Sequence, residues 1–207
     1  RPQGIASAAA AAIDSIDDAA AAAAVAASSD AEWLQWDVSR PLEGDCELQL
    51  VKWDSPAGKE AFWHSSAHVL GATLERLYSA QLTHGPPLDE GFFYDSYLGG
   101  HSVKPDSSAE IEKAFKKMCD EKQPFERVVV SKADCEALFA DNPFKLAIIR
   151  SKLPDDATTT VYRNGDFVDL CRGPHLPHTG RIKAFAMTKT SAALWLGKVG
   201  NDALQRV

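Results

Sequence analysis

One long periodic segment, residues 56 to about 80, constrains the fold more than any other feature of the sequence. Ser55 is a suitable N-cap for a helix there, and Pro56 suits the first helical position. Apolar residues recur in this segment at steps of three and four and so form one face: Phe62, Trp63, Ala67, Leu70, Leu74, Leu77 and Tyr78. A helix of this length needs a core along that whole face, so the rest of the chain must be built against it.

Shorter elements follow this helix without the regular alternation of a parallel sheet. Apolar runs predict strands at residues 91–95, 127–130, 158–162 and 167–170. We expect helices at residues 109–122 and 132–140, and another short element at residues 143–149. Asn164 and Gly165 separate the last two strands and are a strong hairpin signal. We therefore expect an α+β fold in which a mainly antiparallel sheet packs against the long helix.

The chain before this helix predicts a separate small module. Residues 1 to about 30 are dominated by alanine and give no reliable pattern. Residues 46–51 alternate polar and apolar side chains, as a half-buried strand does, so we expect a small β-rich module. The 207 residues of the chain exceed a typical domain of roughly 100–150 residues. We place the boundary between a module of residues 1–53 and a domain of residues 54–207.

Composition narrows the classes of function. The net charge of −7 argues against a phosphate-binding surface that extends over the whole chain, but it is compatible with contact to the end of a nucleic acid. Four cysteines lie far apart without a CxxC pair, which favours reduced thiols in a cytosol-like compartment. No apolar run of ~18 residues predicts a membrane helix. The amino terminus also lacks the basic-then-apolar order of a secretory signal.

The long helix carries the first candidate for chemistry. His64 and His68 are four residues apart, so both imidazoles lie on one face of the helix, with Cβ atoms roughly 5–6 Å apart. Such a pair can share a metal ion or hold one water molecule between the rings. The glutamate of an HExxH peptidase motif is missing, because Ser65 follows His64. Taken alone, this spacing is more often structural than functional.

A second cluster lies near the carboxyl end of the chain. Asp169, Cys171 and His175 fall within seven residues, and the Gly173-Pro174 turn would direct the last two toward a common point. Asp169 and Cys171 alternate along a predicted strand, so both project from the same face. With the two histidines of the long helix, this cluster provides either four ligands for a tetrahedral zinc ion or a polar pocket for acid–base work on a small ester.

Four motifs resemble, in order and spacing, the editing domain of threonyl-tRNA synthetases: HSSAHVLG (64–71), GPPLDEGFFYD (85–95), DLCRGPH (169–175) and LQRV (204–207). The alanyl-tRNA synthetases have a related domain, but the sequences GFFYD and ALWLGK are closer to the threonyl family. Residues 33–52 resemble the end of the small TGS module that precedes this domain, so the resemblance extends over residues 33–207. Leu194 is a departure, because family members commonly have tyrosine there.

The resemblance implies a hydrolase that removes serine wrongly attached to threonine tRNA and spares the threonyl ester. Serine lacks only one methyl group, which supplies roughly 1–3 kcal/mol of discrimination, so a second site must remove the errors. The chain shows no ATP-binding motif, and we expect no aminoacylation core in it.

The resemblance also implies partners and a location. The expected partners are the 3′ acceptor end of tRNA(Thr) carrying serine, and the aminoacylation and anticodon-binding domains of the synthetase. The full-length enzyme is expected to be a homodimer that does not bind membranes. We expect it in the cytoplasm, with an organelle as the alternative.

Five residues are expected, by the resemblance, to form the catalytic part of the pocket: His64, His68, Lys145, Cys171 and His175. Lys145 and His64 would position and polarise water and the ribose hydroxyl, while Cys171 would form a wall that excludes the methyl group of threonine. Direct attack by water is expected rather than a covalent intermediate on Cys171. The threonyl family implies no bound metal, and the alternative is zinc held by the three histidines and the cysteine.

Three residues are expected to bind the substrate: Asp169, Tyr94 and His175. Asp169 would bind the seryl ammonium or hydroxyl group, and the other two would add hydrogen bonds and shape. Lys145 lies among apolar residues and needs a polar partner if it faces inward. Two other functions are compatible with the sequence, namely a zinc-stabilised module that docks tRNA without hydrolysis and a free-standing editing hydrolase of the alanyl type.

Overall fold

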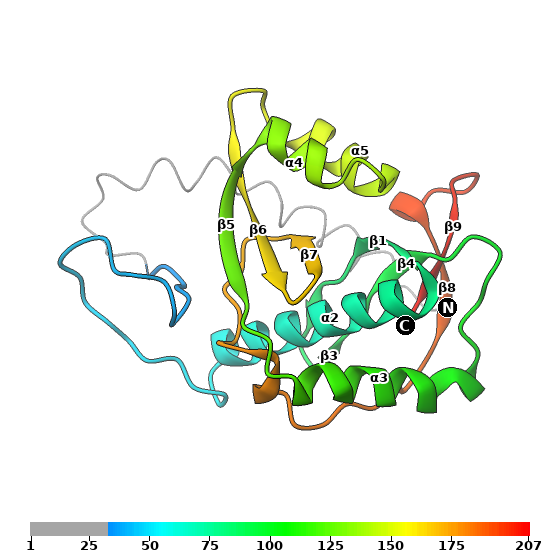
Figure 1. The fold of residues 1–207 in the computed structure, drawn as a ribbon, viewed down its shortest axis with the longest axis horizontal. Coiled ribbons are helices and arrows are strands. Elements are labelled where there is room, and N and C mark those ends of the chain that lie inside the picture. The colour runs from blue at the N-terminus through cyan, green and yellow to red at the C-terminus, as the bar shows by residue number, and fades with distance from the viewer. Residues whose placement is uncertain (1–32) are drawn as a thin grey trace.

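The computed structural model describes residues 33–207, and Figure 1 shows how their helices and strands are arranged. The helices are α2 Pro56–Tyr78, α3 Ser108–Asp120, α4 Lys132–Leu138 and α5 Pro143–Lys152. The strands are β1 Gln81–His84, β2 Pro87–Leu88, β3 Gly91–Phe92, β4 Asp95–Tyr97, β5 Glu126–Ser131, β6 Thr158–Asn164, β7 Phe167–Leu170, β8 Ser191–Leu194 and β9 Ala203–Arg206. Among the helices of these described residues, none has the length and apolar content that crossing a membrane would need.

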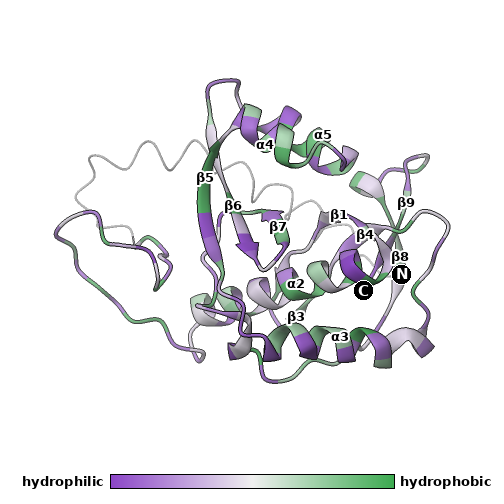
Figure 2. Ribbon diagram, viewed as in Figure 1, coloured by the Kyte–Doolittle hydropathy of each residue, from purple (hydrophilic) through white to green (hydrophobic). Residues whose placement is uncertain are grey.

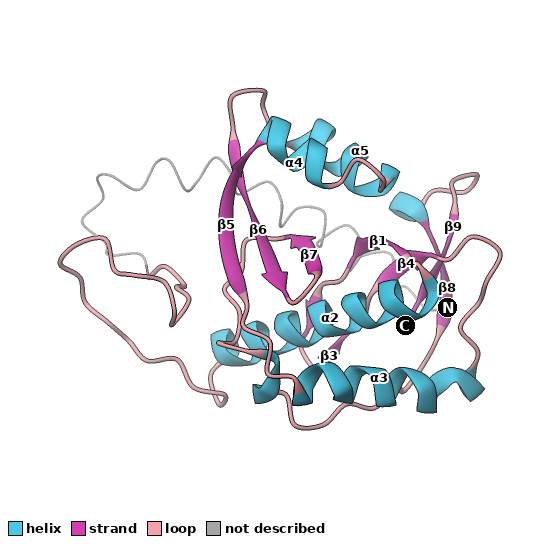
Figure 3. Ribbon diagram, viewed as in Figure 1, coloured by secondary structure: helices cyan, strands magenta, loops and turns pink. Residues whose placement is uncertain are grey.

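The strands form two antiparallel sheets and one short hairpin around the central helix α2 (Figure 3). The larger sheet has the order β1-β4-β9-β8, the smaller has the order β5-β6-β7, and β2 pairs with β3. Helix α3 packs along α2, while α4 and α5 pack on each other and contact β6 and β1, respectively. The predicted α+β fold with antiparallel sheets and a long helix is confirmed.

Helix α2 begins as the sequence predicts, but it is buried on more than one side. Ser55 Oγ accepts a hydrogen bond from the Gly58 amide at 3.1 Å, and Ser79 ends the helix in the left-handed conformation at φ 52°. The sequence predicts one apolar face, whereas every residue from 65 to 74 is buried. The reason is that α3, β1 and the β2–β3 hairpin all pack against this helix. Its buried polar side chains therefore need partners, and Thr73 bonds to a backbone carbonyl one turn earlier.

Two apolar cores support the fold. The larger core joins α2, α3 and the four-stranded sheet, and α3 contributes Ile111, Phe115, Met118 and Cys119 to it. Figure 2 shows hydrophilic residues alternating with these along α3, as expected for a helix with one buried face. The smaller core lies between α4, α5 and β6 and contains Cys135, Phe139, Ile149, Leu153 and Val161.

Some expected elements are wrong. Residues 46–51 are exposed and form no strand, since none of the described strands pairs with them and alternation alone does not provide a hydrogen-bonding neighbour. The strand expected at residues 91–95 is divided between β3 and β4, and Tyr94 between them exchanges backbone hydrogen bonds of 2.9 and 3.1 Å with Val207. Residues 1 to about 30 lie outside the described residues, and the boundary between residues 1–53 and 54–207 stays a prediction.

Candidate active site

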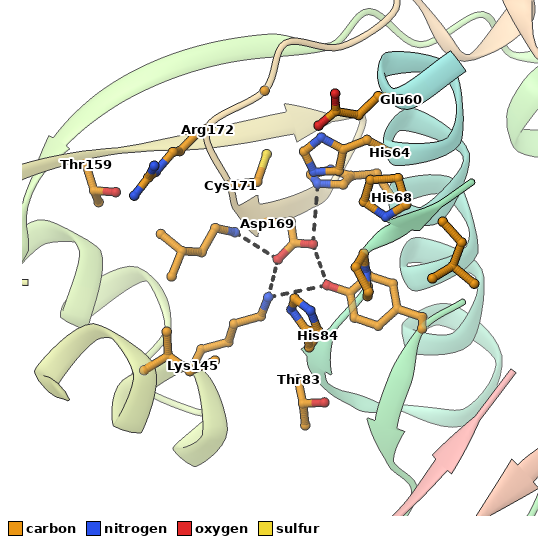
Figure 4. Close-up of a pocket in the computed structure, with 18 of the residues that line it drawn as sticks. Glu60, His64, His68, Thr83, His84, Lys145, Thr159, Asp169, Cys171 and Arg172 are labelled. Carbon is orange, nitrogen blue, oxygen red and sulfur yellow. Dashed lines mark hydrogen bonds and ion pairs between the residues drawn. The ribbon is translucent and has the colours of Figure 1, made fainter. Parts of the chain in front are cut away.

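A pocket of about 1070 Å³ lies between the first half of α2, the end of β1, helix α5 and the segment after β7. Figure 4 shows that its polar side chains come from all of these elements, with His64 and His68 on α2, Lys145 on α5 and Asp169 on β7. Pockets for small ligands commonly have roughly 300–1,000 Å³. The volume is therefore sufficient for a ligand larger than a single amino acid.

The structure brings the two predicted clusters of side chains together. The ring centroids of His64 and His68 are 5.1 Å apart, and the ring of His175 lies 4.4 and 4.2 Å from them. One ring nitrogen from each of these three histidines and the sulfur of Cys171 all lie within 4.8 Å of one another. Helix α2 and the turn after β7, which are about 100 residues apart, thus form one compact group.

Hydrogen bonds determine which ring nitrogen of His175 carries the proton. The Ser65 hydroxyl donates its only hydrogen to the Ala61 carbonyl at 2.7 Å, so it accepts from its other neighbours. These are the Leu176 amide at 2.9 Å and Nδ1 of His175 at 3.0 Å. Nδ1 is therefore protonated, and Nε2 accepts a hydrogen bond from the Cys171 thiol at 3.1 Å.

Burial keeps this group of side chains neutral. It lowers the pKa of His64 to about 3, with a further contribution from neighbouring His68, and the pKa of His68 itself to about 4. Burial also lowers the pKa of His175 well below its usual value. Burial, and then the nearby charge of Asp169, raise the pKa of the Cys171 thiol well above its ordinary value. The group therefore offers neutral imidazole nitrogens and a thiol, not a thiolate nucleophile.

A buried ionic network lies beside the imidazoles. Lys145 Nζ pairs with Asp169 Oδ1, and the Tyr94 hydroxyl donates to Asp169 Oδ2 at 2.5 Å. Lys145 also donates to the Tyr94 oxygen at 3.3 Å, and His68 Nε2 lies 3.6 Å from Asp169 Oδ2 (Figure 4). Burial opposes the ionisation of Asp169, but Lys145 and His68 outweigh it and hold the pKa of this carboxyl at about 2. The pocket therefore holds a fixed ammonium–carboxylate pair.

Two glycines provide space for Tyr94 in this network. A Cβ atom at Gly71 of α2 would lie 2.7 Å from the Tyr94 ring, and one at Gly85 after β1 would lie 2.4 Å from it. Ordinary carbon contacts begin near 3.5 Å. The phenol can therefore reach Asp169 only because both positions lack a side chain.

Lys145 is placed by the start of helix α5. The side-chain oxygen of Asn142 caps this helix and accepts hydrogen bonds from the Phe144 and Lys145 amides at 3.1 and 3.0 Å. The Asn142 amide nitrogen donates to the Leu82 carbonyl of β1 at 2.8 Å. This single side chain fixes α5 to the larger sheet, so that Lys145 reaches the carboxylate of Asp169 on β7.

A zinc ion is the alternative that the sequence leaves open for the group of His64, His68, Cys171 and His175. Three imidazoles and one thiol are the ligands zinc prefers, and ligands at 2.0–2.3 Å from the metal would be roughly 3.5 Å apart. His175 meets the usual pattern, because its Nδ1 proton is bonded to Ser65 and Nε2 faces the group. His68 Nδ1, in contrast, is buried without a hydrogen-bond partner among the described residues. The set thus fits zinc in type and approximate spacing.

Known proteins similar to this chain were identified by comparison. Residues 159–207 match the family model described as the threonyl and alanyl tRNA synthetase second additional domain. A probable cytoplasmic threonine–tRNA ligase 1 of Dictyostelium discoideum is 52% identical over 172 residues, which are 83% of this chain and 24% of the relative. The human cytoplasmic threonine–tRNA ligase 1 is 45% identical over 172 residues, and the mitochondrial threonine–tRNA ligase 1 of Arabidopsis thaliana is 47% identical over 174, with the same shares.

This chain corresponds to the editing region of threonyl-tRNA synthetases. The family expected from the four motifs is thereby confirmed. The chain spans about a quarter of the length of these relatives, whose names describe ligases and hence enzymes.

Three polar residues of this editing region were not expected from the sequence. Ser65 lies inside the first motif but bonds to His175, and Asp37 bonds to the His175 amide from far outside the motifs. His84, at the end of β1, lines the pocket near Lys145 (Figure 4), and burial and Lys145 lower its pKa to about 4. Each is a single polar residue without a spacing pattern, so the sequence offers no signal for its role.

Proposed function

We propose that this region hydrolyses the ester that joins serine to the terminal ribose of tRNA(Thr) and spares the threonyl ester. The observation that carries this proposal is the buried Lys145–Asp169–Tyr94 network beside the neutral imidazoles of His64 and His68 in one pocket. His175 packs against these two rings without lining the pocket itself. An aminoacyl ester presents an ammonium group, a carbonyl and a ribose hydroxyl. The network and the imidazoles provide a carboxylate, an ammonium and uncharged hydrogen-bond acceptors for these groups.

The two members of the Lys145–Asp169 pair have different roles in substrate binding. Asp169 stays ionised and offers its Oδ2 edge, next to Tyr94 and His68, to the ammonium or hydroxyl of the seryl group. Lys145 has three N–H donors, and its bonds to Asp169 and Tyr94 occupy two of them. Lys145 lines the pocket, and in this proposal its third donor binds the ribose hydroxyl or the ester oxygen. The Lys145 ammonium stabilises the negative charge that develops on the ester oxygen during hydrolysis.

Water attacks the seryl carbonyl carbon directly in this proposal. The bond from that carbon to the ribose oxygen breaks, the ribose oxygen leaves as a hydroxyl with a proton from the attacking water, and free serine is released. The pKa of His64, about 3, means that the imidazole is neutral at pH 7 and accepts a hydrogen bond from water instead of carrying a proton. Cys171 is a thiol bonded to His175, and therefore serves as a wall of the pocket and not as a nucleophile. A threonyl group would bring its additional methyl against this wall.

The deciding experiment is deacylation of Ser-tRNA(Thr) beside Thr-tRNA(Thr). We expect the chain to release serine much faster than threonine, and His64→Ala to lower serine release by about 100-fold, because one well-placed hydrogen-bonding or proton-accepting group contributes roughly 10²–10⁴. His101→Ala is the matched control, since His101 is exposed. Equal release of both amino acids, or full activity of His64→Ala, would contradict the proposal.

The alternatives lead to different outcomes of simple assays. An editing hydrolase of the alanyl type would act on alanyl esters of their own tRNA. If zinc bound to His64, His68, Cys171 and His175, it would supply a Lewis acid and an activated water. We expect serine release to survive dialysis against a chelator and metal analysis to find less than one zinc per chain. A docking module without chemistry would bind tRNA and release neither amino acid.

The proposal extends to partners and location. The domain would receive the acceptor end of tRNA(Thr) from the aminoacylation and anticodon-binding parts of a full-length homodimeric synthetase. We place it in the cytoplasm because several relatives are named as cytoplasmic, and the mitochondrial relative of Arabidopsis thaliana keeps an organelle as the alternative. Size measurement of the full-length protein and cell fractionation test these two statements.

A further inference from the structure

Asp37 lies before the long helix, yet its carboxylate is buried beside His175. It is the only buried residue between residues 33 and 52, with 8% of its surface exposed. Carboxylates are rarely buried unless several donors satisfy them. The contacts of Asp37 therefore indicate what this segment does.

Both oxygens of the Asp37 carboxylate contact the surroundings of His175. Oδ1 accepts a hydrogen bond from the His175 amide at 2.9 Å, and Oδ2 accepts one from the Tyr162 hydroxyl at 2.7 Å. The Tyr162 ring in turn packs edge-on against the His175 ring, with centroids 4.5 Å apart. One carboxylate thus fixes both the backbone of His175 and one wall of its ring site.

The segment around Asp37 is itself held in shape by a local turn. The Arg40 amide donates to the Asp37 carbonyl at 3.0 Å, and Trp36 Nε1 donates to the Arg40 carbonyl at 3.2 Å. The Arg40 guanidinium also stacks 3.3 Å above the Trp36 ring. These contacts direct the Asp37 carboxylate toward His175 without help from the residues that line the pocket.

We propose that Asp37 is a positioning residue for His175 in the editing reaction, so that the segment before the domain is part of the active site. This inference rests on the proposed hydrolysis. His175 must direct Nδ1 to Ser65 and Nε2 to Cys171, and rotation or displacement of the ring breaks both bonds. A misplacement of about 1 Å in a reacting group can lower a rate by about 100-fold.

Kinetics of three variants test this role. Asp37→Ala should lower kcat for Ser-tRNA(Thr) by about 10- to 100-fold with KM within about twofold of wild type, because the side chain does not touch the substrate. Asp37→Asn should retain most activity, since its amide oxygen can accept from His175 while Tyr162 donates to the Arg172 carbonyl, 3.2 Å away. Glu47→Ala, which removes an exposed carboxylate of the same segment, should match wild type. Wild-type kcat in Asp37→Ala, or equal loss in the alanine and asparagine variants, would overturn the inference.

Nitrogen-15 NMR of the His175 ring gives a readout that does not depend on hydrolysis. Wild type and Asp37→Asn should show the Nδ1-protonated form, and Asp37→Ala should show a mixture of the two tautomers. Tyr162→Phe retains the bond to the His175 amide and should show a smaller change. An unchanged spectrum in Asp37→Ala overturns the positioning role whatever the activity. If Asp37→Ala changes the spectrum but wild type releases no serine, the positioning role of Asp37 stands and the proposed hydrolysis is refuted.

Discussion

The histidines of the pocket make stability depend on pH. Burial lowers the pKa of His64 to about 3 and the pKa values of His68 and His84 to about 4. A histidine in an unfolded chain has a pKa near 6.5, so between about pH 6.5 and 4 the unfolded chain binds more protons and the folded state loses stability as the pH falls. Asp169 titrates below this window, and Glu75, whose pKa burial raises, opposes the trend.

We therefore expect the free energy of unfolding to decrease by at least about 2 kcal/mol between pH 7 and pH 5. Urea unfolding at the two pH values measures this change. His68→Asn should reduce the decrease, because it removes one buried group that must gain a proton on unfolding. His101→Asn, at an exposed position, should keep the full decrease. An identical decrease in wild type and His68→Asn would contradict the neutral state of this imidazole.

Cys171 permits a test of specificity at the scale of one side chain. Cys171→Ala should continue to release serine, since no covalent intermediate on the thiol is proposed. It should release threonine faster, and the preference for serine should fall by about tenfold, because space for one methyl group corresponds to roughly 1–3 kcal/mol. Cys46→Ala, at an exposed cysteine, is the control in the same deacylation assay. Complete loss of serine release in Cys171→Ala would indicate a nucleophilic thiol instead.

Residues that carry chemistry were visible in the sequence only where they form a pattern. The spacing of His64 and His68 predicts a shared face, and the structure places their rings 5.1 Å apart. Asp37, Ser65 and His84 have no such pattern, because their roles depend on partners 110 or more residues away or on burial by other elements. Hydrogen bonds of this kind follow from the tertiary structure and could not be predicted from the sequence.

At the scale of elements, length and local signals decided what could be predicted. Helix α2 has an N-cap and seven apolar positions, and β6 and β7 flank a hairpin signal, so these elements were expected close to their observed bounds. Strands β1, β8 and β9 have four residues each and were missed. Strand β9 pairs with β4 over a separation of 111 residues, as in the Asp95–Arg206 pair. Such strands are specified by their partners and not by their own sequences.

Because β1 and α2 pack closely against Tyr94, a side chain added at Gly85 should disturb both stability and activity. Gly85→Ala would place a Cβ atom 2.4 Å from the Tyr94 ring and should destabilise the fold by about 1–3 kcal/mol. Serine release should fall as well, because the displaced phenol loses Asp169. Thermal unfolding measures the first effect, with Gly100→Ala, where the added atom meets open space, as the control. The Gly85→Ala substitution should cost less in a Tyr94→Ala background, and an equal cost in both backgrounds would contradict the steric cause.

At the scale of the whole molecule, net charge bears on how the chain meets tRNA. The chain has a net charge of −7, which disfavours broad contact with the tRNA backbone. The pocket lining is balanced in charge, because Lys59, Lys145, Lys152 and Arg172 stand beside Asp54, Glu60, Asp89 and Asp169. Contact is therefore expected to be confined to the 3′ end, and the remaining affinity for tRNA would come from other parts of a full-length synthetase.

This arrangement predicts how the chain responds to a shortened substrate. A seryl minihelix contains only the acceptor arm of tRNA(Thr). It should be hydrolysed with a kcat/KM within about threefold of that for the whole tRNA, because this chain is expected to make no contacts with the rest of the tRNA that would add binding energy. The rate should rise linearly with substrate into the micromolar range, because binding to an acidic surface is weak, and it should change little with salt, because few phosphates are contacted. Stopped assays on both substrates at two salt concentrations measure these quantities. A strong preference for whole tRNA, lost at high salt, would mean that this chain contacts the tRNA body through a surface its net charge does not predict.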